Sequence, residues 1–333
     1  MNGRTLGKVW IAVAFGFIVA ACSDDQASLL SFEEEEGQGI QGAKAVGGND
    51  PVQVMMAEIN AGLASEGKDY RLGIVEFYAA GESEEQGRTV FLRDIGNKQL
   101  GHHFIAGDER RTNTTDITFI VDLLDGATTS GLAPATTDAA INRAMQTWQD
   151  VNCSEIQIAD LGSFNFDFGV VQNQLGFGGS PFFFADVTHA GFLPGPFFDA
   201  IAPSGSTFIL GVTFTFVFID VSQLPDIVFT DLDNNRKLDT AFREIYYNDA
   251  FVWVIDQNVP GFPDFDVETV ALHEAGHGFS QAHFGTAFVT NSNGKLHFSP
   301  RAVMNAAYSG IQQEIGKTDN AGHCSIWAQW PNS

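Results

Sequence analysis

A short motif near the C-terminal end of the chain has the residue types and spacing of a metal site. His273 and His277 are four positions apart, and Glu274 directly follows the first histidine. The preceding residues 266–272 predict a helix with Asp266 as its N-cap. Positions i and i+4 share one face of a helix, so both imidazoles can reach a single Zn²⁺ at ~2.0–2.1 Å. Glu274 is then a candidate general base for a water that the ion activates.

A third histidine and a methionine extend this motif. His283 lies six residues after His277, and Met304 follows in the stretch Ala-Val-Met-Asn-Ala-Ala-Tyr. With these residues the chain resembles the metzincin zinc endopeptidases, closest to their matrixin-like branch, which have H-E-x-x-H-x-x-G-x-x-H and then a Met-turn. The resemblance covers about residues 112–333. It implies three zinc ligands, a general base and a Met-turn methionine: His273, His277, His283, Glu274 and Met304.

One position departs from the metzincin pattern. The glycine expected between the second and third histidines is Ser280. That glycine ends the helix at positive φ and lets the chain return to the metal, whereas a serine there carries strain of about 1 kcal/mol or more. The departure concerns His283 as the third ligand. Glu314 is the alternative, although it follows the Met-turn.

The first 22 residues predict an export signal. Arg4 and Lys8 precede an apolar run at residues 9–21, which is too short to span a bilayer because a span needs about 20 apolar residues. The run ends at Cys22 in a Val-Ala-Ala-Cys sequence that resembles a bacterial lipobox, and this implies a lipid anchor on the cysteine. We therefore expect residues 1–22 to be a lipoprotein signal peptide, with an ordinary signal peptide as the alternative. The protein would be membrane-anchored at the outer membrane, on the periplasmic or cell-surface side.

Charge and composition narrow the possible function classes. The 333 residues contain 17 Lys and Arg against 41 Asp and Glu, and the net charge of −24 repels phosphate backbones. Nucleic-acid binding is therefore excluded. Hydrophobic residues make up 44% of the chain, which is a globular composition with enough length for a sizeable core. We expect a monomer whose partners are a protein or peptide substrate and, through Cys22, a membrane.

Two cysteines remain once Cys22 is assigned to lipid. In an oxidising compartment we expect Cys153 and Cys324 to form a disulfide, with two buried thiols as the alternative. Only Cys22 precedes Cys153, so a cysteine switch of the kind that blocks zinc in matrixins is not expected.

The composition divides the mature chain into three parts. Residues 23–50 are acidic and glycine-rich and predict a flexible tether. Residues 51–111 predict a small α+β unit whose role the sequence does not indicate. Residues 112–333 predict an α+β catalytic domain with a twisted mixed sheet and an active-site helix. Within it, residues 244–249 resemble the edge strand that flanks the substrate in metzincins.

An acidic stretch in the second half of the chain resembles a calcium loop. Oxygen-bearing groups occupy alternate positions, as in loops that bind Ca²⁺. They are Asp231, Asp233, Asn235, the carbonyl of Lys237, and Asp239. Arg236 replaces the glycine of an EF-hand, so this is not an EF-hand, and a solvated acidic turn is the alternative.

The remaining histidines have no partners at metal spacing. His102 and His103 are adjacent, and we expect them at the surface. His189 lies where matrixins have a structural-zinc ligand, but its partners are not visible, so we expect a structural hydrogen bond. His297 and His323 are expected to be surface or packing residues.

These features together predict a zinc-dependent endopeptidase that hydrolyses internal peptide bonds of extracytoplasmic proteins, with Glu274 as general base. The substrate is expected to add as a strand to the edge of the sheet. Two alternatives are a non-catalytic surface binding or adhesion protein that zinc stabilises, and a zinc amidase that acts on cell-wall peptides. The expected cofactors are Zn²⁺ and, at the acidic loop, Ca²⁺.

Overall fold

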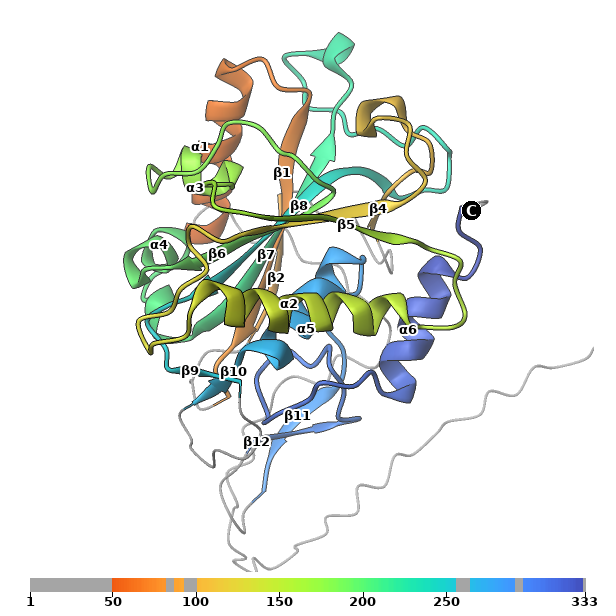
Figure 1. The fold of residues 1–333 in the computed structure, drawn as a ribbon. Coiled ribbons are helices and arrows are strands. Elements are labelled where there is room, and N and C mark those ends of the chain that lie inside the picture. Colours follow the sequence, from red (N-terminus) through yellow and green to blue (C-terminus); the bar gives the residue numbers. More distant parts are fainter. Residues whose placement is uncertain (1–49, 82–86, 93–100, 256–263, 291–295, 332–333) are drawn as a thin grey trace, which may run out of the picture. The chain divides into compact units, whose positions relative to one another are not determined.

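The computed structural model describes residues 50–331, apart from 82–86, 93–100, 256–263 and 291–295 (Figure 1). The predicted signal peptide, Cys22 and all of the predicted tether except Asp50 lie outside the described residues. The described residues belong to one compact unit, residues 38–333. None of the helices described has the length and apolar character needed to cross a membrane.

A mixed eight-stranded sheet lies at the centre of the described chain. Its order is β2-β1-β7-β8-β6-β4-β5, and β3 pairs with β8. Strands β5, β4, β6 and β8 run parallel, whereas β7 is antiparallel to both β8 and β1. The strands are β1 (Tyr70–Ala79), β2 (Thr89–Phe91), β3 (His102–His103), β4 (Ile117–Asp122), β5 (Ile158–Phe164), β6 (Val187–Leu193), β7 (Ile209–Phe218) and β8 (Leu238–Asn248).

Helices cover both faces of this sheet, and each face has its own hydrophobic core (Figure 1). One core contains residues of α2, α5 and α6, and the other contains residues of α1, α3 and α4. The helices are α1 (Pro51–Ser65), α2 (Pro134–Gln149), α3 (Val170–Gln174), α4 (Gly195–Ile201), α5 (Val267–Gly278) and α6 (Lys317–Trp327). Two short strand pairs complete the fold, β9 (Trp253–Val254) with β10 (Phe265–Asp266) and β11 (Thr286–Val289) with β12 (Leu296–Ser299).

The alternation of residues along β7 explains why the sheet separates two different environments. Phe214 and Phe216 belong to the core on the α1 face. Thr213 and Thr215 point to the other face, where Thr213 contacts α5. The α5 side of β7 therefore has polar side chains that can hold a site, while the α1 side of this strand is apolar.

Residues 51–111 are not a separate unit in this structure. Strand β1 pairs with β7 from Tyr70 opposite Phe218 to Ala79 opposite Ile209, and all ten of its residues are buried. A strand that is buried on both faces needs a covered position inside a sheet, and here the two cores supply it. The predicted small unit that precedes the catalytic domain is therefore built into the same sheet as residues 112–333. His102 and His103 are buried as well, because β3 pairs with β8, so the prediction of surface positions was wrong.

The predicted edge strand near residues 244–249 is an interior strand. These residues end β8, which lies between β7 and β6. Glu244 of this strand has its partners inside the fold. Its carboxylate accepts hydrogen bonds from Val170 N at 2.6 Å and Val171 N at 2.9 Å, at the start of α3. On one side β8 pairs with β7, and β7 in turn pairs with β1, which belongs to residues 51–111.

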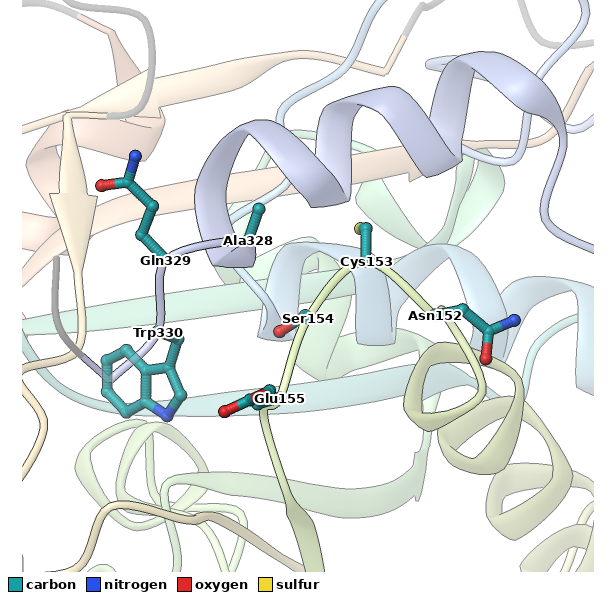
Figure 2. A pocket seen from close by; sticks show the side chains of 7 residues that line it. All are labelled: Asn152, Cys153, Ser154, Glu155, Ala328, Gln329 and Trp330. Atoms are coloured by element: carbon teal, nitrogen blue, oxygen red, sulfur yellow. The ribbon is translucent and has the colours of Figure 1, made fainter.

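Cys153 and Cys324 are joined by a disulfide with Cα atoms 5.7 Å apart. The bond connects the segment after α2 to α6. Ser154 donates a hydrogen bond to the carbonyl of Trp327 at 2.9 Å and strengthens the same connection. Figure 2 shows the surface hollow beside this link, which is lined by Asn152, Cys153, Ser154, Glu155, Ala328, Gln329 and Trp330.

Removal of the disulfide should lower the stability of the whole unit. We expect Cys153→Ser with Cys324→Ser to reduce the free energy of unfolding by about 2–5 kcal/mol, because the crosslink closes a long loop in the unfolded chain. Urea unfolding of the double variant and of the oxidised parent measures this difference. A parent treated with reductant serves as the control and should match the variant. Equal unfolding midpoints for oxidised parent and variant would contradict the prediction.

Candidate metal centre

Three histidine rings direct their Nε2 atoms at one another. Helix α5 carries His273 and His277, and the turn after α5 brings in His283. The Nε2–Nε2 distances are 3.1 Å between His273 and His277, 3.2 Å between His273 and His283, and 3.0 Å between His277 and His283. Nitrogen atoms that share a tetrahedral Zn²⁺ lie about 3.3 Å apart. These three residues could therefore hold one metal ion.

Hydrogen bonds at the opposite ring nitrogens set the tautomers of two of these rings. The Nδ1 of His273 lies 2.7 Å from Val303 O, and the Nδ1 of His277 lies 2.8 Å from Gln281 O. A carbonyl only accepts, so each Nδ1 donates and each Nε2 presents a lone pair. Burial lowers the pKa of His273 well below its ordinary range and that of His283 to about 3, which favours neutral rings. Lone pairs that converge on one point repel one another unless a cation lies between them, so this donor set fits zinc.

The N-terminus and the middle of α5 explain how the helix reaches this position. Asp266 is the N-cap, as predicted, and its Oδ2 accepts a hydrogen bond from Thr269 N at 2.8 Å. Gly276 lets Met304 approach the helix, because a Cβ at this position would lie 2.3 Å from the sulfur of Met304. The glycine between the two helix histidines therefore allows Met304 to pack closely against α5.

A carboxylate on α6 holds the turn at Met304, and no sequence pattern predicted this contact. Asp319 accepts hydrogen bonds from Val303 N at 3.0 Å and from Met304 N at 3.1 Å. Phe284 N in turn donates to Met304 O at 3.0 Å, next to His283. Asp319 thus links α6 to the segment that bonds His273 and Phe284, the residue after His283. Its place in the first turn of a helix suggests only a helix-capping residue, so the sequence held no signal for this role.

Glu274 lies on the side of α5 that faces β7. Its Oε2 accepts a hydrogen bond from the hydroxyl of Thr213 at 2.5 Å, and its Oε1 is buried without a partner among the described residues. Gly211 leaves room for the carboxylate, because a Cβ there would lie 2.5 Å from Oε1. Burial raises the pKa of Glu274 to about 8, and a bound divalent cation would lower it. A carboxylate with one oxygen fixed and one oxygen free has the arrangement of a general base.

Strand β1 contacts both helix histidines, although it lies outside the metzincin resemblance. The Tyr78 ring stacks on the His273 ring with centroids 3.8 Å apart. The Oε1 of Glu76 lies 3.2 Å from His277 Nδ1. The shorter bond to Gln281 O takes the Nδ1 proton, so Glu76 acts on this ring as a nearby negative charge. Burial lowers the pKa of His277, but the negative charge of Glu76 outweighs burial and raises that pKa. A metal ion at Nε2 therefore competes with a proton there.

The main chain of β1 is held on both of its edges beside the centre. On one edge, Glu76 pairs with Thr213 and Tyr78 with Gly211, the part of β7 that faces Glu274. On the other edge, Ala79 N donates to Ala306 O at 3.3 Å, and Tyr308 N donates to Ala79 O at 2.8 Å. Residues 78–79 therefore use the hydrogen-bonding positions that an added extended peptide would use here. The available sequence signal was the carboxylate of Glu76 inside an otherwise apolar run.

Ser280 adopts the conformation that the expected glycine would adopt. Its φ is +64°, in the left-handed region, and its N–H donates to His277 O at 2.9 Å. The turn therefore forms despite the side chain. It brings His283, and not the alternative Glu314, to His273 and His277.

The predicted calcium loop brings together three carboxylates that could hold an ion, those of Asp231, Asp233 and Asp239. Arg110 contacts this group, because its Nη2 lies 2.9 Å from Asp239 Oδ2. Asn235 donates to Asp233 at 2.9 Å and accepts from Lys237 N at 2.8 Å. Both are hydrogen bonds within the loop. Calcium binding here stays a prediction.

A second acidic group was not anticipated. Asp122, Asp125 and Asp167 meet where β4 ends. Burial raises the pKa of Asp122 to about 6, while its Oδ1 accepts hydrogen bonds from Leu124 N at 2.7 Å and Asp125 N at 3.1 Å. The pair Asp-x-x-Asp after a strand was the only available signal.

The other histidines have structural partners. His189 Nδ1 lies 2.7 Å from the hydroxyl of Tyr247, as expected for a structural hydrogen bond, and burial lowers its pKa to about 3. His323 is buried and stacks against Trp148.

Comparison with known proteins gives no identity for the chain. No protein-family model matches it, and no curated protein sequence matches it. The inference of function therefore depends on the geometry and chemistry of the centre itself.

Proposed function

We propose that this protein is a zinc-dependent endopeptidase with a metzincin-like catalytic fold. The observation that carries the proposal is the convergence of three imidazole nitrogens, 3.0–3.2 Å apart, next to Glu274, whose Oε1 has no partner in the part of the chain that the structure describes. Three protein ligands with an open fourth position are typical of catalytic zinc, whereas structural zinc has four protein ligands. The mixed α+β fold is compatible with this proposal. The extracytoplasmic location and the lipid anchor stay predictions, because Cys22 lies outside the described residues.

The roles of the chain's own residues follow from their contacts. Bound zinc would supply Lewis-acid chemistry, which polarises a carbonyl and lowers the pKa of water. Glu274 would take a proton at its free Oε1 and later give it to the leaving amine. Thr213 holds the other carboxylate oxygen and thus fixes the direction of Oε1. The main chain of β7 and of residues 306–308 would align an extended peptide between them.

Strand β1 has to yield before a substrate can take this position. Its residues 76–79 already pair with β7, Ala79 also bonds residues 306 and 308, and the Tyr78 ring lies on the His273 ring. Helix α1 and the first half of β1 belong to the core that also contains α4, so they cannot leave without exposing that core. Movement of the Tyr78 end is the smaller change. We therefore propose that the chain as described is a slow, partly blocked form of the enzyme.

A zinc-stabilised protein without catalytic activity is the second candidate, and the burial of the centre favours it. His273, His277 and Glu274 are each 0% exposed. A purely structural metal site has no use for a nearby carboxylate with a free oxygen, and this argues for the enzyme. The two candidates predict different results for a variant in which Tyr78 no longer covers His273, because only the enzyme would then hydrolyse peptides faster.

Tyr78→Ala should open the centre and speed hydrolysis. We expect about a two- to tenfold higher kcat/KM for a peptide library, because an aromatic stack contributes about 0.5–1.5 kcal/mol. The protein is zinc-loaded and lacks residues 1–22. Phe77→Ala is the matched control, since its ring is also buried but lies in the core on the opposite face. Equal gains from both variants would show that loosening the fold, and not uncovering His273, is responsible.

Glu274→Gln in the Tyr78→Ala background should abolish cleavage. We expect a loss of at least about 10²-fold at unchanged zinc content, because the amide cannot accept the proton. The substrates are a peptide library, an unfolded protein and cell-wall fragments, each with and without a zinc chelator. If Tyr78→Ala binds zinc but cleaves none of these, the non-catalytic candidate holds. Cleavage of the cell-wall fragments alone would indicate an amidase.

A further inference from the structure

A fully buried arginine lies behind the turn that brings His283 to the other histidines. Arg243 on β8 is 0% exposed, and burial lowers its pKa to about 9, so it remains a cation at neutral pH. Its Nη1 donates to Gly278 O at 2.5 Å, and its Nη2 donates to the hydroxyl oxygen of Ser280 at 2.7 Å. One guanidinium thus bonds the last residue of α5 and the left-handed residue that follows the helix.

The remaining hydrogen-bond partners of Arg243 are neutral groups, one of which is the hydroxyl of Thr240 at 3.4 Å from Nη2. Its Nη2 also lies 2.7 Å from His102 Nδ1, and its Nε lies 3.3 Å from the hydroxyl of Thr215. None of the ion pairs found among the described residues includes Arg243. A buried cation without a carboxylate at ion-pair distance is costly, so its hydrogen bonds and the nearby charges of Glu76 and Asp186 together have to offset that cost.

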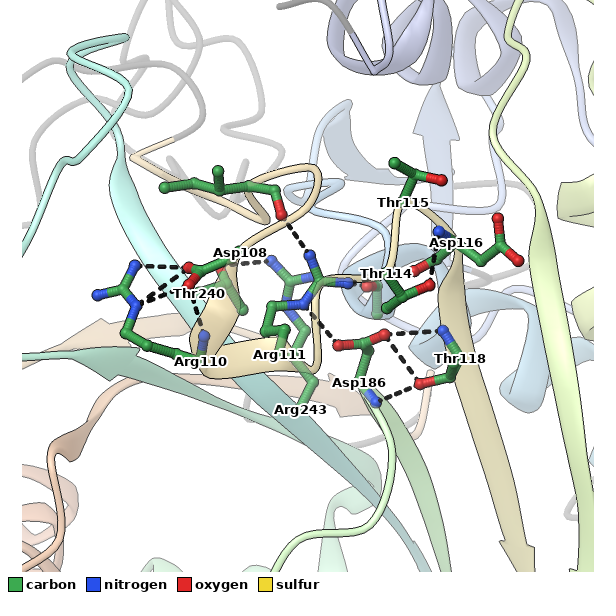
Figure 3. Close-up of polar contacts among 12 residues, drawn as sticks. Asp108, Arg110, Arg111, Thr114, Thr115, Asp116, Thr118, Asp186, Thr240 and Arg243 are labelled. Carbon is green, nitrogen blue, oxygen red and sulfur yellow. Dashed lines mark hydrogen bonds and ion pairs between the residues drawn. The ribbon is translucent and has the colours of Figure 1, made fainter.

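Its neighbour Arg111 shows the contrast. Figure 3 shows Arg243 beside Arg111 and Asp186, and the Nε of Arg111 lies 2.6 Å from Asp186 Oδ1. Both guanidinium groups lie over the Phe104 ring, at 4.5 Å for Arg111 and 4.7 Å for Arg243. Asp186 therefore forms its ion pair with Arg111, whereas Arg243 donates hydrogen bonds to the turn after α5.

We propose that Arg243 is a positioning residue for the third zinc ligand: its fork holds Ser280 in the left-handed conformation and so keeps His283 at the centre. Glycine achieves this turn by lacking a Cβ, whereas this chain achieves it with a hydrogen bond. A hydrogen bond to a charged group contributes more than one left-handed residue costs. Ser280, which replaces the expected glycine, and the buried Arg243 thus act together to form this turn. This inference depends on the proposed zinc site.

Two substitutions at Ser280 test the proposal without changing Arg243. Ser280→Ala keeps the Cβ and loses the hydroxyl, so the turn should open and the zinc dissociation constant should rise by about 10–100-fold, the range for outer-shell partners. Ser280→Gly loses the hydroxyl and the Cβ together, so its affinity should stay within about threefold of the parent. Chelator competition measures the affinity of zinc-loaded protein lacking residues 1–22. The absorption spectrum of the Co²⁺-loaded protein reports the ligand set.

Arg243→Met should weaken zinc binding in the parent and much less in the Ser280→Gly background, because glycine no longer needs the fork. Arg243→Lys keeps the charge and loses the fork, and it serves as the matched variant if methionine prevents folding. His283→Ala provides the reference Co²⁺ spectrum for a lost third ligand, which Ser280→Ala should approach. A parent-like affinity and spectrum for Ser280→Ala would overturn the role of Arg243 while leaving the zinc site intact. No zinc binding by the parent, or no effect of His283→Ala, would overturn the proposed site and this inference together.

Discussion

The convergence of three imidazole nitrogens on one point is the constraint on which the rest of this structure depends. His273 and His277 donate from Nδ1 to the carbonyls of Val303 and Gln281, so in the neutral rings the inner nitrogens present lone pairs to one another. Such a centre needs support from several directions and a cation to complete it. The supports come from distant parts of the chain: Asp319 holds the Met-turn, and Arg243 bonds the turn at Ser280.

Strand β1 changes what this centre can do. A strand beside a candidate metal centre covers it, and it also occupies the main-chain hydrogen-bonding groups that an extended peptide would need. Tyr78 covers His273, and Glu76 places negative charge next to His277. Two residues of β1 therefore lie against the three histidines, and in the proposed enzyme the access of a substrate depends on one end of this strand.

Local sequence patterns predicted the histidines of the candidate centre, whereas no local pattern predicted the residues that hold them in place. The i, i+4 histidines and the Asp266 N-cap follow from helix geometry, and the helix begins where that pattern indicates. Arg243 and Ser280 are 37 residues apart, and neither has a signal that points to the other. The same holds for Glu76, which was placed in a separate unit because no periodicity shows which strand will be its neighbour. The interior position of β8 was missed for that reason too, since strand order is a long-range property.

The ligand set of the zinc-loaded protein tests the central claim most directly. X-ray absorption at the zinc edge, on protein lacking residues 1–22, should show three imidazole nitrogens at ~2.0–2.1 Å and one further light-atom ligand. The His283→Ala variant should show two imidazoles. A centre with only two imidazoles in the parent, or one whose spectrum His283→Ala does not alter, would contradict this account.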